Sequence, residues 1–173
     1  MNSGPSTYDY LNLSIAIVAA FLALTALAWQ AWAWLLSGPR VTAEMKWGLL
    51  GAGGGLVSGP PRADWRSVDL ATQGFTDPVV AVEIRNKGRT PTTVTGAAVR
   101  YSNGIQLTGT APPAGDVLPH RLEAHSTFTY LIDGGHVGQG IRATVRTGGT
   151  RRIHVIVTLA TGKTVQTNAA DFV

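Results

Sequence analysis

The chain has 173 residues, enough for one compact domain and an appendage. It contains no cysteine, which excludes disulfides, thiol catalysis and cysteine-based zinc sites. All 14 Lys and Arg and nine of the ten acidic residues lie at or after Arg40, so that part of the chain carries a net charge of +5. Such an excess is typical of a solvated surface and is also compatible with anionic partners.

An uncharged stretch near the N-terminus predicts a membrane-spanning helix. No charged residue lies between Asp9 and Arg40, and a run of about 20 apolar residues crosses a hydrocarbon core about 30 Å thick. We therefore expect a tail over residues 1–10 and a transmembrane helix over residues 11–37, which Gly38-Pro39 ends. A cleaved signal peptide is the alternative. It is disfavoured because the first nine residues contain no Lys or Arg.

Aromatic and basic residues on the two flanks predict how this helix lies in the cell membrane. Tyr and Trp prefer the membrane–water interface. The expected interface anchors are Tyr8 and Tyr10 at one end and Trp29, Trp32 and Trp34 at the other. Lys and Arg close to a span stay in the cytoplasm, and Arg40, Lys46, Arg62 and Arg66 all follow the helix. We therefore expect a single-pass protein with its N-terminus outside and the following domain in the cytoplasm.

Small residues repeat along the same helix. Ala16 and Ala20, and likewise Ala19 and Ala23, are four positions apart, and such small pairs let helix backbones approach closely in lipid. They are candidate helix-packing positions for self-association or for another membrane protein. The alternative is that alanine is simply abundant in this chain.

Residues 40–173 predict an all-β domain. Residues 41–49 alternate between apolar and polar side chains, as a strand with one buried face does. Three further segments place their apolar residues on one face, and these residues are Val80, Val82 and Ile84; Phe128, Tyr130 and Ile132; and Ile153, Val155, Val157 and Leu159. Seven or eight short strands separated by turns predict an antiparallel β-sandwich, with a small β-barrel as the alternative.

Two local signals refine this plan. Asn103-Gly104 is the preferred pair for a type I′ hairpin turn. Residues 134–143 are the one stretch after the membrane-spanning segment where a short helix is conceivable.

The stretch VVAVEIRNKGRTPTTVTG contains an N-x-G-x-x-P turn formed by Asn86, Gly88 and Pro91, and an L-x-x-x-S element follows at Leu122 and Ser126. With the closing VIVTLATGKTV, this pattern resembles the strand plan of small bacterial immunoglobulin-like domains. The whole chain is also similar to uncharacterised membrane-anchored proteins of GC-rich Gram-positive bacteria. The resemblance implies an immunoglobulin-like sandwich. It implies no active site, because its motifs are turn residues.

Catalytic and cofactor motifs are not found in the sequence. The glycine run Gly51–Gly55 lacks the Gly-Lys-Ser/Thr ending of a phosphate-binding loop, and Pro60-Pro61 opposes the helix that would follow. His120 and His125 share a segment with Glu123, but their spacing is not that of a metal site. We expect His154 to face solvent, opposite the buried face of its strand. The sequence therefore predicts a non-catalytic protein without a cofactor or metal.

One basic cluster is a candidate binding patch for an anion or a lipid headgroup. It consists of Arg142, Arg146, Arg151 and Arg152 around a glycine turn. Antiparallel strands joined by this turn would gather the guanidinium groups, which bind phosphate through two parallel hydrogen bonds. A solvated hairpin is the alternative interpretation. Nucleic acid is not expected as a partner, because no set of stacking aromatic residues accompanies the arginines.

Two functions are compatible with these observations. The first is a membrane-anchored binding or scaffolding protein, an accessory subunit of a membrane complex, whose sheet edges offer sites for strand addition. The second is a membrane-bound sensor or effector, in which the cytoplasmic β domain binds an anionic ligand and drives oligomerisation. The expected partners are membrane lipid and another membrane protein or a second copy of the chain.

Overall fold

The structure is a computed structural model that describes residues 7–61, 70–108 and 112–171. The chain divides after Gly38 into two compact units, a helical one and a β one. Arg62 and Arg66, two of the basic residues used to predict orientation, lie outside the described residues.

The first unit is the helix α1 (Thr7–Ser37), which begins within the segment predicted as a tail. Its stretch Tyr10–Trp34 is long and apolar enough to cross a membrane, since 25 residues span about 37 Å at 1.5 Å each. The hydroxyls of Ser14 and Thr25 donate to the carbonyls of Leu11 and Phe21 at 2.8 Å. These polar groups are therefore satisfied within the helix and do not need water.

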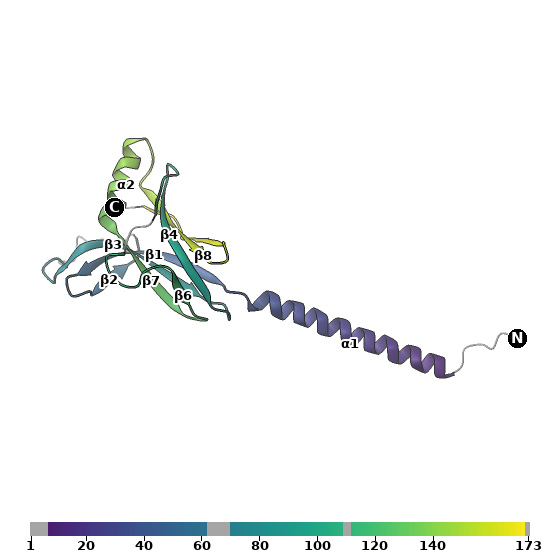
Figure 1. Cartoon of the computed structure of the whole chain (residues 1–173). Coiled ribbons are helices and arrows are strands. Elements are labelled where there is room, and N and C mark those ends of the chain that lie inside the picture. Colours follow the sequence, from purple (N-terminus) through teal and green to yellow (C-terminus); the bar gives the residue numbers. More distant parts are fainter. Residues whose placement is uncertain (1–6, 62–69, 109–111, 172–173) are drawn as a thin grey trace. The chain divides into compact units, whose positions relative to one another are not determined.

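The second unit is built from two antiparallel sheets with separate edges (Figure 1). The first sheet has the order β2 (Leu56–Gly59), β1 (Val41–Gly51), β3 (Phe75–Asn86) and β7 (Thr127–Asp133). The second has the order β10 (Ala170–Asp171), β8 (Arg152–Leu159), β4 (Thr92–Tyr101) and β5 (Gln106–Thr108), while β6 (His120–Leu122) pairs with β4 and β9 (Thr164–Gln166) with β8. The mainly β prediction is confirmed. The barrel alternative is wrong, because the described strands do not close on themselves.

The strand order follows the immunoglobulin plan. The neighbours β1, β3 and β7 correspond to strands A, B and E of one sheet, and β4, β8 and β10 correspond to C, F and G of the other. The chain changes sheet three times among the described strands, between β3 and β4, between β6 and β7, and between β7 and β8, where the helix α2 (Gly134–Arg146) makes the connection. The predicted short helix is therefore present, and it continues to Arg146.

The core lies between the sheets on the faces that the alternating patterns predict. The apolar residues predicted for β3, β7 and β8 are all at most 6% exposed. Val137 and Ile141 of α2 join the same core. The helix packs closely because Gly134 and Gly140 lack side chains: a Cβ at these positions would lie 2.6 Å from the Pro78 carbonyl oxygen and 2.2 Å from the Tyr101 hydroxyl oxygen.

The predicted type I′ turn at Asn103-Gly104 is wrong. Of the two residues only Gly104 has a positive φ, of 86°, whereas type I′ needs two such residues. The Tyr101 N–H donates to the Ile105 carbonyl at 2.9 Å. The Asn103 side chain accepts from the Ile105 N–H at 3.1 Å. This places one more residue in the loop, as in a hairpin with a glycine bulge.

The β unit has two ends. At the first, which we call the entry end, β1 begins, β3 ends and β7 begins, as the pairs Val41–Asn86 and Arg85–Thr127 show. β4 begins and β8 ends at the same end, because Val94 pairs with Leu159. The opposite end carries α2, as Figure 1 shows, and we call it the α2 end.

Candidate binding surfaces

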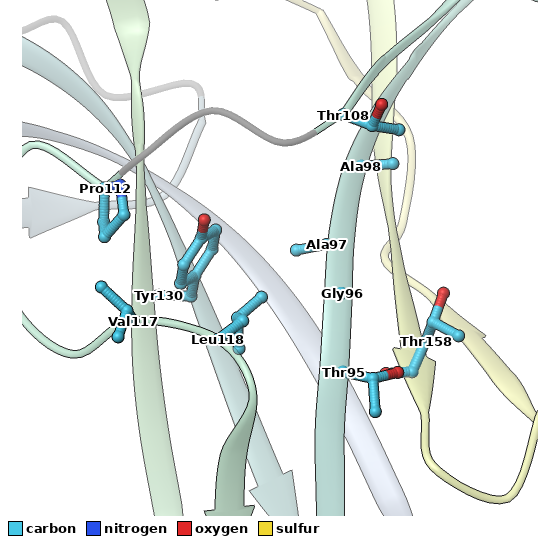
Figure 2. A pocket seen from close by; sticks show the side chains of 10 residues that line it. All are labelled: Thr95, Gly96, Ala97, Ala98, Thr108, Pro112, Val117, Leu118, Tyr130 and Thr158. Atoms are coloured by element: carbon cyan, nitrogen blue, oxygen red, sulfur yellow. The ribbon is translucent and has the colours of Figure 1, made fainter.

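A groove of about 480 Å³ lies beside β4 (Figure 2). Its walls come from the two sheets and from the loop over residues 112–119. The lining consists of Thr95, Gly96, Ala97, Ala98 and Thr108 from the β4–β5 edge, Thr158 from β8, Pro112, Val117 and Leu118 from the loop, and Tyr130 from β7.

Beside the groove, β4 has a different described neighbour toward each of its ends. β6 pairs with residues 92–94 of β4 and β5 with residues 98–100. Among the described strands none pairs with residues 95–97 on this side. The β4–β8 register also shifts between Val94 and Gly96. Among the described residues, an added Cβ at Gly96 would meet only Thr158, at 4.0 Å.

The groove is suited to an apolar segment with backbone polar groups. The described residues of its lining include no acidic or basic side chain. Its one ionisable group is Tyr130, and burial raises the pKa of that phenol. The Thr95 hydroxyl donates to the Thr158 carbonyl at 3.2 Å, within the sheet. These lining side chains include no pair of acid and base groups that could transfer a proton.

The contacts of the histidines are those of structural residues. The His120 ring stacks on Phe128 with a centroid distance of 3.9 Å, and its Nδ1 lies 3.6 Å from an Asp116 carboxylate oxygen. His125 adopts a left-handed backbone with φ of 57°. His154 lies on the face of β8 opposite the core, as expected, but it is half-buried and its Nε2 atom is covered. Within the described ranges, no three His, Asp or Glu side chains gather as metal ligands would.

The predicted arginine patch lies at the α2 end, but a helix and not a strand supplies half of it. Arg142 and Arg146 are four residues apart on the exposed side of α2, where such residues are neighbours. Arg151 is exposed in the connection to β8, and the Arg152 Nε lies 3.4 Å from a carboxylate oxygen of Asp171. The expected pair of strands around the glycine turn is therefore wrong, and the patch remains a prediction.

The Arg152–Asp171 pair lines a second hollow of about 470 Å³ between β1 and the C-terminal segment. The carboxylate contacts only Nε of this exposed guanidinium and partly neutralises its charge, so Asp171 would repel an anion there. Arg142, Arg146 and Arg151 make none of the described ion pairs.

The predicted membrane residues all lie on α1. The five interface aromatics, Tyr8, Tyr10, Trp29, Trp32 and Trp34, are 62–77% exposed. Ala16, Ala19, Ala20 and Ala23 are exposed as well. Their roles as interface anchors and helix-packing positions remain predictions.

Asn86 is a structural hub whose role the sequence did not reveal. Its side chain is fully buried. The Oδ1 atom accepts from the N–H groups of Arg40 and Gly88 at 3.3 and 2.9 Å. The Nδ2 atom donates to the carbonyls of Thr90 and Glu123 at 2.8 and 3.2 Å. One amide therefore joins the start of β1, the turn after β3 and the β6–β7 loop. The N-x-G-x-x-P motif was the signal for it.

No protein-family model and no curated protein sequence matches the chain.

Proposed function

We propose that this protein is a single-pass, membrane-anchored binding module that is not an enzyme. In this proposal α1 holds the chain in the cell membrane, and the β-sandwich binds an extended apolar segment of another membrane protein in the groove beside β4. The β-sandwich faces the cytoplasm, as the basic residues after the helix favour.

The observation that carries the proposal is the exposure of α1. Its large apolar side chains are 57–77% exposed, from Leu11 at the lower limit to Tyr8 at the upper. Burying one such side chain contributes about 1.5–3 kcal/mol. More than a dozen of them therefore favour transfer from water to lipid by tens of kcal/mol, on the order of the sum of those terms.

The groove supports the second part of the proposal. Small and apolar residues of β4, β7 and the loop over residues 112–119 form its floor, which suits an extended apolar segment. A partner in the same membrane loses less translational and rotational entropy on binding than a soluble one, because both chains are already confined to two dimensions.

Extraction and labelling test the anchor. The full chain should remain in the membrane pellet at alkaline pH. Leu22→Arg with Leu24→Arg should lower the pelleted fraction, since on the scale of membrane insertion a central Arg costs about 3 kcal/mol and a Leu contributes only about 0.5 kcal/mol. Leu22→Met with Leu24→Met is the matched control. A mature chain that lacks α1 would show a cleaved signal peptide and refute the anchor. A single thiol, Gln106→Cys on exposed β5, should react with an impermeant maleimide only in permeabilised cells. Reaction in intact cells would place the sandwich outside.

Site-specific photo-crosslinking tests the groove. A benzophenone residue at Val117, which lines the groove and is 66% exposed, should give a defined adduct in native membranes. The same residue at Ile105, 62% exposed and outside the lining, is the control. Gly96→Leu should abolish the adduct because it fills the groove, and Gly53→Leu in the β1–β2 turn should not, because its added side chain meets open space. Equal adducts from both positions, or an adduct that survives Gly96→Leu, would refute the groove as the site.

The sensor hypothesis is favoured by one observation, the exposed Arg142–Arg146 pair on α2. It predicts ligand-dependent oligomers that disappear when Arg142 and Arg146 are both replaced by Ala. Oligomers that persist in this double variant would contradict it.

A further inference from the structure

The net positive charge of the β unit is concentrated at its entry end. Six basic residues and one acidic residue, Glu123, lie there, and the basic ones are Arg40, Arg85, Lys87, Arg89, Arg121 and Lys163. The remaining described part of the unit has six basic and six acidic residues. The entry end therefore carries a net charge of +5, and the rest of the described unit carries none.

Backbone and amide hydrogen bonds hold two parts of this basic surface together. The Lys87 N–H donates to the Arg40 carbonyl at 2.7 Å, and the Asn86 side chain accepts from the Arg40 N–H at 3.3 Å. The turn that carries Lys87 and Arg89 is thus fixed beside the point where the chain enters β1. Lys163 lies in the β8–β9 turn, where its carbonyl accepts from the Leu159 N–H at 2.9 Å.

Most of these cations have no carboxylate of their own. Within the described residues only Arg121 is paired, through its Nε to Glu123 at 2.7 Å. Arg40, Arg85, Lys87, Arg89 and Lys163 are exposed and make none of the described ion pairs. Five charges therefore remain available to an anionic surface.

We infer that the entry end binds the headgroups of anionic phospholipids in the leaflet where α1 ends, an inference that rests on the proposed membrane anchor. Only Gly38, Pro39 and Arg40 separate α1 from β1, a tether of about 10 Å at most. That length is close to the Debye length of about 8 Å at physiological salt. Each basic residue near an anionic membrane strengthens binding about fivefold.

The arrangement suits many headgroups better than one free anion. The five cations come from the entering chain, the end of β3, the turn after it and the β8–β9 turn. None of them lines either of the two described hollows. A single phosphate needs converging donors, whereas a charged surface needs only exposed cations on one side of the molecule.

Energy transfer to labelled lipid in vesicles tests the inference with the full chain. A donor is attached at Thr161→Cys in the entry-end turn, and a second sample carries it at Gln139→Cys on α2. Transfer from Thr161 should rise when phosphatidylglycerol is added to phosphatidylcholine vesicles. The rise should vanish in about 1 M salt, where the Debye length is about 3 Å. The rise in energy transfer from the donor at residue 161 should exceed any change in transfer from the donor at residue 139.

Variants separate the entry end from the α2 end. Lys87→Ser, Arg89→Ser and Lys163→Ser together should abolish the rise, whereas Arg142→Ser, Arg146→Ser and Arg151→Ser should leave it intact. A response that is absent, or equal in both triple variants, would overturn the inference. Loss of the rise in millimolar inorganic phosphate at constant ionic strength would also overturn it, in favour of a discrete anion site.

Flotation with phosphatidylcholine vesicles after an alkaline wash separates the inference from the anchor. A chain that floats but does not respond to phosphatidylglycerol refutes the lipid surface and retains the anchor. A chain that does not float refutes both.

Discussion

Replacing Asn86 with Ala should destabilise the sandwich more than any single exposed polar substitution. The buried amide makes four hydrogen bonds, two of them at 2.8 and 2.9 Å and two longer ones at 3.2 and 3.3 Å. With about 1 kcal/mol for each bond, and less for the longer ones, the loss is about 3–4 kcal/mol. This is a large part of the 5–15 kcal/mol that is typical of a folded domain.

Equilibrium unfolding by urea in non-ionic detergent, followed by circular dichroism of the β unit, measures this loss. Asn103→Ala is the matched control, because its exposed amide accepts one hydrogen bond in a turn, worth about 0.5–1 kcal/mol. Asn86→Asp keeps the acceptor and removes the donor, so it should be at least half as damaging as Asn86→Ala. If Asn86→Ala unfolds at the same urea concentration as Asn103→Ala, the hub does not hold the entry end together.

Three further predictions concern stability. Gly140→Ala should destabilise by about 1–3 kcal/mol through its clash with Tyr101, although the same change in a free helix stabilises by about 1 kcal/mol. Thermal unfolding measures the sign, and Tyr101→Phe should not relieve the cost, because the added Cβ would still lie 2.3 Å from the ring carbon Cζ. Asp133→Ala should cost about 1 kcal/mol by removing the N-cap of α2, measured by the same assay. Burial raises the pKa of Tyr101 and Tyr130, and the hydrogen bond to Glu83 raises the pKa of Lys46. The folded state therefore binds more protons than the unfolded state above pH 10.0, so the free energy of unfolding should fall there. Tyr130→Phe should flatten this slope in urea titrations, and an unchanged slope would contradict the assignment.

The faces of the strands were predictable from the sequence because burial imposes a period of two. Val155 and Val157 are fully buried, and the alternation around them leaves one register that places them inside. The long apolar helix was predictable for a related reason, since its pattern is local. In both cases neighbouring residues alone determine the outcome.

α2 illustrates what local patterns cannot supply. Its sequence GGHVGQGIRATVR contains four glycines, and each lowers helix propensity by about 1 kcal/mol relative to Ala. Gly134 and Gly140 are required because the helix contacts Pro78 and Tyr101, which are distant in sequence. The Asp133 cap was the one local sign of a helix start. The arginine patch was predicted on a pair of strands because the helix that carries Arg142 and Arg146 has so weak a local signal.

The groove and the basic entry end were hidden from sequence reasoning for the same reason. The residues that line the groove range from Thr95 to Thr158, and only the sheet topology brings them together. The basic residues of the entry end range from Arg40 to Lys163, and only the sheet topology brings them to one side. Net charge alone does not show this separation.

The positions of these surfaces within the β unit allow them to act together. Lipid bound at the entry end would contact the turns after β3 and β8, whereas the groove opens midway along β4, between Thr95 and Ala98. A partner segment therefore does not compete with the headgroups. Asn86 links the entering chain to the basic turn, so a change that loosens this amide should weaken lipid contact without altering the groove. If the Asn86→Ala variant still gives the Val117 adduct but no longer responds to phosphatidylglycerol, the two surfaces are separate. If the adduct is lost at a temperature where the sandwich remains folded, they are not.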